Sequence, residues 1–173
     1  MRSYAAAHSE HPNIMEAAGE VLGDLSERMG GDADLAVIFA SGAHRSGLTD
    51  VASGLTELFG VRTVLGVSVS GVVSGGREVE SGNGLSVWIG DTGAVTPLRL
   101  EAIDSGRTTL GLPTNITPHS VILLLADPFS FPVDPLLDVL NDDHPTVQVV
   151  GGLASAGRAP GENLLVLDGS KFY

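Results

Sequence analysis

The chain contains no cysteine. This absence excludes disulfides, thiolate metal sites and thiol nucleophiles, and it fits a cytoplasmic protein. Basic residues are scarce as well, since 9 Lys and Arg stand against 21 Asp and Glu, which gives a formal net charge of −12 at pH 7. Because no basic cluster interrupts this acidic balance, we expect neither nucleic acid nor an anionic membrane as a partner.

Long apolar segments are also missing. The run Val121–Ala126 is far shorter than the ~20 residues that a membrane helix needs. Polar residues at 8–11 follow the N-terminus before an apolar signal segment could form. With 173 residues, 43% of them hydrophobic, the chain is nevertheless long enough to bury a core. We therefore expect a cytoplasmic globular protein.

The first half of the chain reads as a helix followed by a strand, helix, strand unit. Apolar residues recur at helical spacing over 14–29, which predicts an amphipathic helix, and we treat residues 1–32 as an N-terminal helical segment. A buried strand is predicted over 35–40, a second helix over 48–59 and a second strand over 62–68. This order predicts a parallel pair of strands joined by the helix.

The second half contains another unit of the same kind, and its first strand is the most apolar stretch of the chain. The run Val121–Ala126 has no polar face and stops at Asp127 and Pro128, so we predict that it is the central strand of the sheet, covered on both sides. A short helix over 134–141 and a strand over 147–150 follow it.

Between the two units the sequence changes to short alternating segments separated by glycine-rich turns. Strands over 77–80, 85–89 and 95–103 are expected to form an antiparallel meander. A last strand is predicted over 164–169, and we expect the domain of residues 33–173 to be truncated, continuing beyond Tyr173. The predicted fold is an α/β mixed sheet of two βαβ-like units with this meander between them.

The two units also share the spacing of a Gly and a Ser after the second strand. Gly66 and Ser70 of the first unit match Gly151 and Ser155 of the second at equal separation. An internal duplication explains the match, and so does the general likeness of βαβ units.

The loops that follow these strands are the predicted binding site. Backbone N–H groups in glycine-rich loops can hold a carboxylate, although the same residues also suit plain turns. Neither loop has the spacing of a phosphate-binding motif, so we expect no nucleotide and no other cofactor. Arg77 is proposed to pair with a ligand carboxylate and Asp127 with a ligand amine. The predicted ligand-binding residues are Ser68, Ser70, Gly71, Arg77, Asp127, Gly151, Gly152 and Ser155.

Catalytic and metal sites are expected to be absent. Residues 66–70 miss the final glycine of the G-x-S-x-G nucleophile elbow. A serine hydrolase would need Ser68 or Ser155 beside His44 or His119, a pairing that no spacing rule supports. The clusters at 8–11 and 142–144 carry metal-ligating residue types, but we interpret the first as a mobile terminus and the second as solvated surface.

Four segments in this order resemble the FIST N-terminal domain, a family named for F-box and intracellular signal transduction proteins. They are Asp34–Phe39, Gly66–Val79, Ala126–Phe131 and Val150–Ser155. The resemblance implies a sensory domain that binds a small ligand, an amino acid or a small carboxylate, and that works with a FIST C-terminal domain or a signalling output domain.

We therefore expect a small-molecule sensor that is not an enzyme. Two alternatives stay open at this stage. One is a hydrolase-like enzyme. The other is a ligand-free assembly domain that forms a homo-oligomer through the unpaired edge of its final strand.

Overall fold

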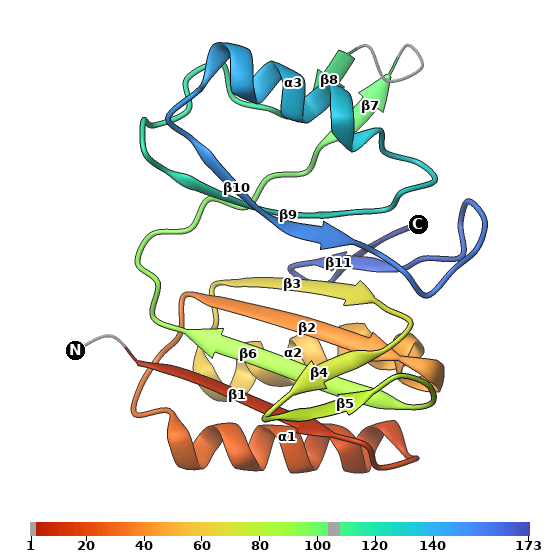
Figure 1. The fold of residues 1–173 in the computed structure, drawn as a ribbon. Coiled ribbons are helices and arrows are strands. Elements are labelled where there is room, and N and C mark those ends of the chain that lie inside the picture. Colours follow the sequence, from red (N-terminus) through yellow and green to blue (C-terminus); the bar gives the residue numbers. More distant parts are fainter. Residues whose placement is uncertain (1–2, 104–107) are drawn as a thin grey trace.

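The computed structural model describes residues 3–103 and 108–173, and a six-stranded mixed sheet forms its base (Figure 1). The strand order is β1-β6-β2-β3-β11-β12. These strands are β1 (Tyr4–Ser9), β6 (Gly84–Gly90), β2 (Leu35–Ser41), β3 (Thr63–Ser68), β11 (Leu165–Leu167) and β12 (Ser170–Phe172). Helices α1 (Ile14–Arg28) and α2 (Leu48–Phe59) contact the sheet and each other.

The predicted helices and the first βαβ unit are confirmed. Asn13 caps α1 by accepting hydrogen bonds from the backbone N–H groups of Met15 and Glu16. Gly60, in the left-handed conformation with φ 58°, ends α2. Strands β2 and β3 are parallel, whereas β6 pairs antiparallel with β2, so the sheet is mixed, as predicted.

The prediction of a mobile N-terminus is wrong. Residues 4–9 form β1, which pairs antiparallel with β6 at the edge of the sheet. Its inward side chains, Ala5 and Ala7, are small, which is why the strand carries no strong apolar signal. These alanines and the buried residues of α1 belong to the same hydrophobic core as β2 and β6.

The second unit has the predicted strand, helix and strand, but its strands are not part of the main sheet. Strand β9 (Val121–Ala126) is parallel to β10 (Gln148–Leu153), and α3 (Val133–Asp143) connects them. The prediction that 121–126 is the central strand is wrong, because within residues 3–103 and 108–173 β9 pairs only with β10, in a separate two-stranded sheet. Strand β11 pairs with β3 and occupies the sheet edge that β9 would need.

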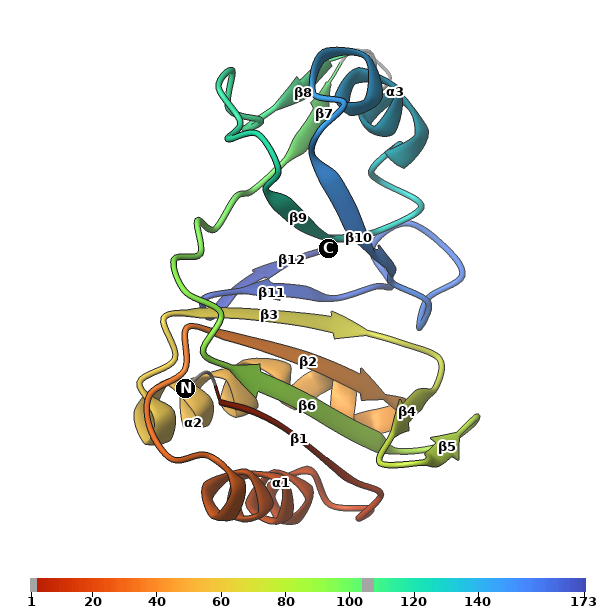
Figure 2. The same cartoon turned by 60° about the vertical axis from the view of Figure 1, so that its left-hand side comes forward.

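The views in Figures 1 and 2 place this second unit on one side of β11, with β2, β6 and both large helices on the other. The internal duplication is not confirmed, since the first unit lies inside the six-stranded sheet and the second does not. The final strand is paired on both sides, with β3 and with β12. The free edge on which the assembly alternative relied is therefore absent from β11.

The predicted meander forms in part. Strands β4 (Val72–Ser74) and β5 (Arg77–Val79) make a hairpin, and β6 joins the main sheet. The strand predicted over 95–103 is reduced to β7 (Glu101–Ile103), which pairs with β8 (Thr108–Leu110). Among the described residues, no helix combines the length and apolar character needed to cross a membrane.

Candidate functional site

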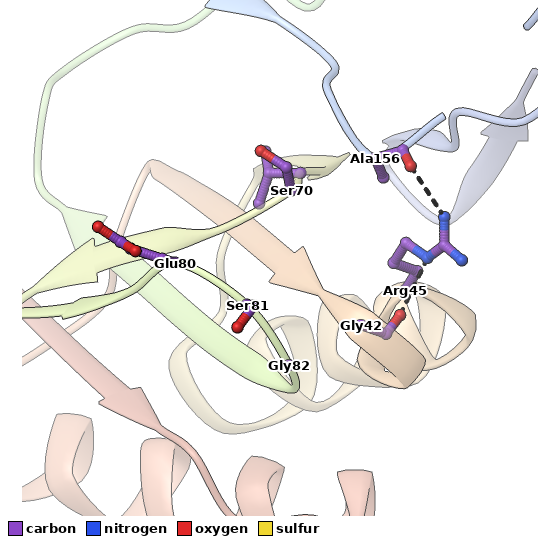
Figure 3. Close-up of a pocket in the computed structure, with 8 residues that line it drawn as sticks. Gly42, Arg45, Ser70, Glu80, Ser81, Gly82 and Ala156 are labelled. Carbon is purple, nitrogen blue, oxygen red and sulfur yellow. Dashed lines mark hydrogen bonds between the residues drawn. The ribbon is translucent and has the colours of Figure 1, made fainter. Parts of the chain in front are cut away.

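A polar pocket of about 270 Å³ lies where β2 and β3 end (Figure 3). Parallel strands place their carboxyl ends at one edge of a sheet, and the loops that follow them meet there. Here the loop after β2 is the short 3-10 helix η1 (Gly42–Gly47), and the loop after β3 runs into the β4–β5 hairpin. The pocket is lined by Gly42, Arg45, Val69, Ser70, Glu80, Ser81, Gly82 and Ala156.

Arg45 supplies the positive charge of this pocket. Its Nε donates a hydrogen bond to the carbonyl oxygen of Gly42 at 2.9 Å, and its Nη1 donates to the carbonyl of Ala156 at 3.5 Å. Within the described part of the chain, Arg45 forms no ion pair with a carboxylate. The guanidinium therefore retains donors for an anionic ligand group.

Glu80 supplies the negative charge. Figure 3 shows its side chain on the opposite side of the pocket from Arg45, with Ser70 and Ser81 between the two ends. Glu80, Ser70 and Ser81 are exposed to solvent, so a ligand can reach them. A cation at one end, a carboxylate at the other and hydroxyls between them suit a small molecule that carries both charges.

Two predicted site residues, Ser70 and Ser155, lie in contact. The backbone N–H of Ser70 donates to Oγ of Ser155 at 3.1 Å, and the two hydroxyl oxygens are 3.4 Å apart. The N–H of Ser155 in turn donates to the carbonyl of Ser68 at 3.2 Å. The structure thus joins the two glycine- and serine-rich loops at the pocket wall.

Ser68 ends β3 and Gly71 lies in the loop that follows, and the contacts of both support the fold of this segment. The Ser68 side chain is buried, and its Oγ accepts a hydrogen bond from the N–H of Leu164 at 2.8 Å. A side chain at Gly71 would meet the backbone of Val79 and Glu80, so glycine allows the close approach of the β4–β5 hairpin.

Asp127 lies at the end of β9 and is nearly fully buried. Its Oδ1 accepts a hydrogen bond from Nδ2 of Asn163 at 2.8 Å, whereas Oδ2 is buried and has no hydrogen-bond partner in the part of the chain that the structure describes. Burial raises the pKa of Asp127, but the Asn163 hydrogen bond and the nearby polar groups of Ser130 and Phe129 lower it by more, and the resulting pKa is below the usual value. Asp127 is thus held as a carboxylate outside the pocket lining.

The remaining predicted site residues are not brought to the pocket. Gly151 and Gly152 lie within β10 and are exposed. Arg77 lies on β5, where its Nη1 is 3.8 Å from the Glu10 carboxylate and its side chain is largely exposed.

Sequence reasoning missed Arg45 and Glu80. The signal for Arg45 was present, because residues 41–47 follow a predicted strand just as residues 69–71 do. The same strand-end argument that selected Ser70 applies to that loop. Glu80 had no comparable signal, since its position depends on how the β4–β5 hairpin folds back over the strand ends.

In the described part of the chain, the histidines hydrogen-bond to groups other than these serines. Nε2 of His44 lies 2.8 Å from the carbonyl oxygen of His11, and the His44 ring is buried away from the pocket lining. Among the hydrogen bonds of the described residues, none joins a histidine to Ser68, Ser70 or Ser155. The same residues contain no group of three side chains suited to hold a metal ion.

Fold and pocket together define an α/β domain with a polar site at the ends of a parallel strand pair. The family described as FIST N domain matches residues 34–173, and the chain belongs to this family. Domains of this family are regarded as sensory domains of signal-transduction proteins.

Curated relatives match most of this chain. The uncharacterized proteins MT0656 and Rv0628c of Mycobacterium tuberculosis are each 31% identical over 163 residues, which is 92% of this chain and 43% of the relative. The uncharacterized protein Mb0898c of Mycobacterium bovis is 31% identical over 160 residues, 91% of this chain and 42% of the relative. The chain therefore spans less than half the length of these relatives.

Proposed function

We propose that this chain is a cytoplasmic sensory domain that binds a small carboxylate, and preferably an amino acid, in the pocket between Arg45 and Glu80. The observation that carries the proposal is the Arg45 guanidinium. It lies at the strand ends beside two hydroxyls and has no carboxylate partner among the described residues. Family membership supports the sensory role.

The pocket offers complementary groups for each end of such a ligand. The Arg45 guanidinium can bind a carboxylate through two parallel hydrogen bonds. Glu80 can accept from an ammonium group, and the hydroxyls of Ser70 and Ser81 can bind the polar atoms between them. A volume of about 270 Å³ limits the ligand to metabolite size.

In this proposal the domain senses and does not catalyse. Ligand binding is passed on to a FIST C-terminal domain or another signalling output domain. The net charge of −12 argues against a nucleic acid as that partner.

The test is a thermal-shift screen of the purified chain against amino acids and small carboxylates. A ligand at 100 times its Kd adds about 2.7 kcal/mol of stability, so a genuine ligand raises the Tm measurably. Arg45→Gln should abolish the shift, because glutamine keeps polar atoms but has neither the charge nor the paired donors of the guanidinium.

Arg77→Gln is the matched control, since Arg77 is exposed on β5 and does not line the pocket. This variant should respond to the ligand as the parent does. Circular dichroism of the Arg45→Gln protein establishes that it is folded. An undiminished thermal shift in folded Arg45→Gln protein would refute the pocket as the ligand site.

A further inference from the structure

The β9–β10 sheet lies outside the main hydrophobic core. The buried core residues come from β1, β2, β3, β6, α1, α2 and neighbouring loops, with Leu164 and Val166 from residues 164–166, and none comes from β9, α3 or β10. On the two-stranded sheet itself, Val121, Val150 and Leu153 are 58%, 49% and 51% exposed. The register places Val121 and Val150 on one face of the pair and Leu153 on the other, so apolar side chains flank the edge of β10 on both faces. The β10 surface is defined as these three residues and the unpaired edge of β10.

The β9–β10 pair lacks the covering elements that parallel sheets ordinarily have. Parallel strands are covered on both faces by other elements, and two-stranded sheets alone are marginally stable. Within the described residues, β9 and β10 pair only with each other. Five of the six residues of β10 are exposed, so the strand presents unpaired backbone groups beside apolar side chains.

The charge of the connecting helix argues against a second copy of the chain as the partner that covers the β10 surface. Helix α3, which connects the two strands, carries Asp134, Asp138, Asp142 and Asp143 and no Lys or Arg. Two copies meeting here would bring acidic helices together, and each chain has a net charge of −12. The surface fits a partner that is apolar at its centre and basic near α3.

The relatives contain a candidate for this partner. The matched stretch makes up 43% of each M. tuberculosis relative, so more than half of that protein lies outside it. We infer that the β10 surface is covered by a β-strand from the counterpart of this unmatched part, whether it is joined to this chain or is a separate polypeptide. The strand adds to the open edge of β10, and its neighbourhood supplies apolar and basic side chains.

The experiment replaces the matched stretch of the M. tuberculosis relative with this chain. Amide hydrogen exchange is then compared between the chimera and the chain alone. The N–H of Gln148 donates to Ser120 on the β9 side, so the alternate amides of 149, 151 and 153 face the open edge. We expect these three amides to exchange at least ~10-fold more slowly in the chimera, because strand addition gives them hydrogen-bond partners. Leu153→Asp should remove this protection. Leu58→Asp is the matched control, since Leu58 is 63% exposed on α2, away from β10, and it should leave the protection intact.

Two results of the chimera and dimer measurements overturn the inference. One is a folded chimera in which the amides of 149, 151 and 153 exchange as fast as in the chain alone. The other is a dimer of the chain alone, seen by analytical ultracentrifugation, in which these amides are already protected, because a second copy is then the occupant. Should the chimera fail to fold by circular dichroism, the unmatched part is added to the chain as a separate polypeptide. Lack of protection at 149, 151 and 153 there also counts against the inference.

Discussion

Hydrogen bonds of three buried polar side chains join residues 163–164 to the two βαβ units. Ser68 at the end of β3 accepts from the N–H of Leu164, and Asn163 donates to Asp127 at the end of β9. The Asn163 side chain also accepts from the N–H of Gly157 at 2.7 Å. Buried hydrogen bonds of this kind specify one arrangement of the backbone, because any other leaves polar groups unpaired. They therefore fix residues 156–164, and with them the pocket wall at Ala156.

Asp127 makes this arrangement dependent on pH. Because its pKa is lower in the folded protein than in the unfolded chain, the carboxylate stabilises the fold above about pH 4. That stabilisation is lost as the pH falls through the folded-state pKa. We expect Asp127→Asn to lower the free energy of unfolding at pH 7 by roughly 1–2 kcal/mol. The difference from the parent protein should shrink towards pH 3.

Urea denaturation from pH 3 to pH 7 measures this difference. Asp138→Asn, an exposed position on α3, is the control and should change stability little at any pH. A difference between parent and Asp127→Asn that stays constant down to pH 3 would contradict the role assigned to the Asp127 carboxylate.

At the scale of elements, the glycines of β10 differ sharply in what they allow. Gly151 has φ 145°, and a side chain there would meet the carbonyl of Leu124 on the neighbouring strand. Gly152 has open space around it. The close approach of β10 to β9 thus requires glycine at one position and tolerates a side chain at the next.

Replacing each glycine by alanine tests this difference. Gly151→Ala should separate β10 from β9 locally and raise the amide exchange rate of 148–153, at a cost of about 1–3 kcal/mol. Gly152→Ala should change stability by no more than about 0.5 kcal/mol. Exchange measured by mass spectrometry reports both effects, and equal behaviour of the two variants would show that the Gly151 contact does not restrain the strand.

Elements that depend on local interactions could be predicted from the sequence, whereas the placement of elements that depend on distant interactions could not. Caps and periodicity located α1 and α2, and the parallel β2–β3 pair followed from the order strand, helix, strand. The place of β9 could not be predicted, because it depends on β11, which lies about forty residues later and takes the edge of β3. The sequence of β9 is apolar enough for a central strand, but apolar character does not say which edge is free.

The same division holds for the candidate site. The rule that ligands bind beyond the carboxyl ends of parallel strands selected Ser70, which lines the pocket, and Ser155, which contacts it. The same rule selected Asp127, which follows the strand of 121–126, whereas Arg77 was selected for its charge and its place after a glycine turn. The structure places Arg77 beside Glu10 and Asp127 beside Asn163, both outside the pocket lining. Charge identifies a candidate, but the three-dimensional position of its partners decides what it can bind.

The two parts of the molecule differ in how many large hydrophobic side chains they bury. The core cluster joins the main sheet to α1 and α2, whereas the second unit buries few large side chains, among them Leu136 and Leu140 of α3. Hydrophobic burial is the main source of stability, so the two parts should differ in their resistance to unfolding.

Trp88, the single tryptophan of the chain, allows the two parts to be followed separately. It lies on β6 and stacks on Tyr4 of β1 with ring centroids 5.8 Å apart, so its fluorescence reports only on the main sheet. In urea, we expect the amides of β9 and β10 to lose protection at a lower concentration than the midpoint of the Trp88 transition. This order follows because the second unit can open without exposing the core of the first. Coincidence of the two transitions would instead mean that the buried links through Ser68, Asn163 and Asp127 couple both units into one cooperative fold.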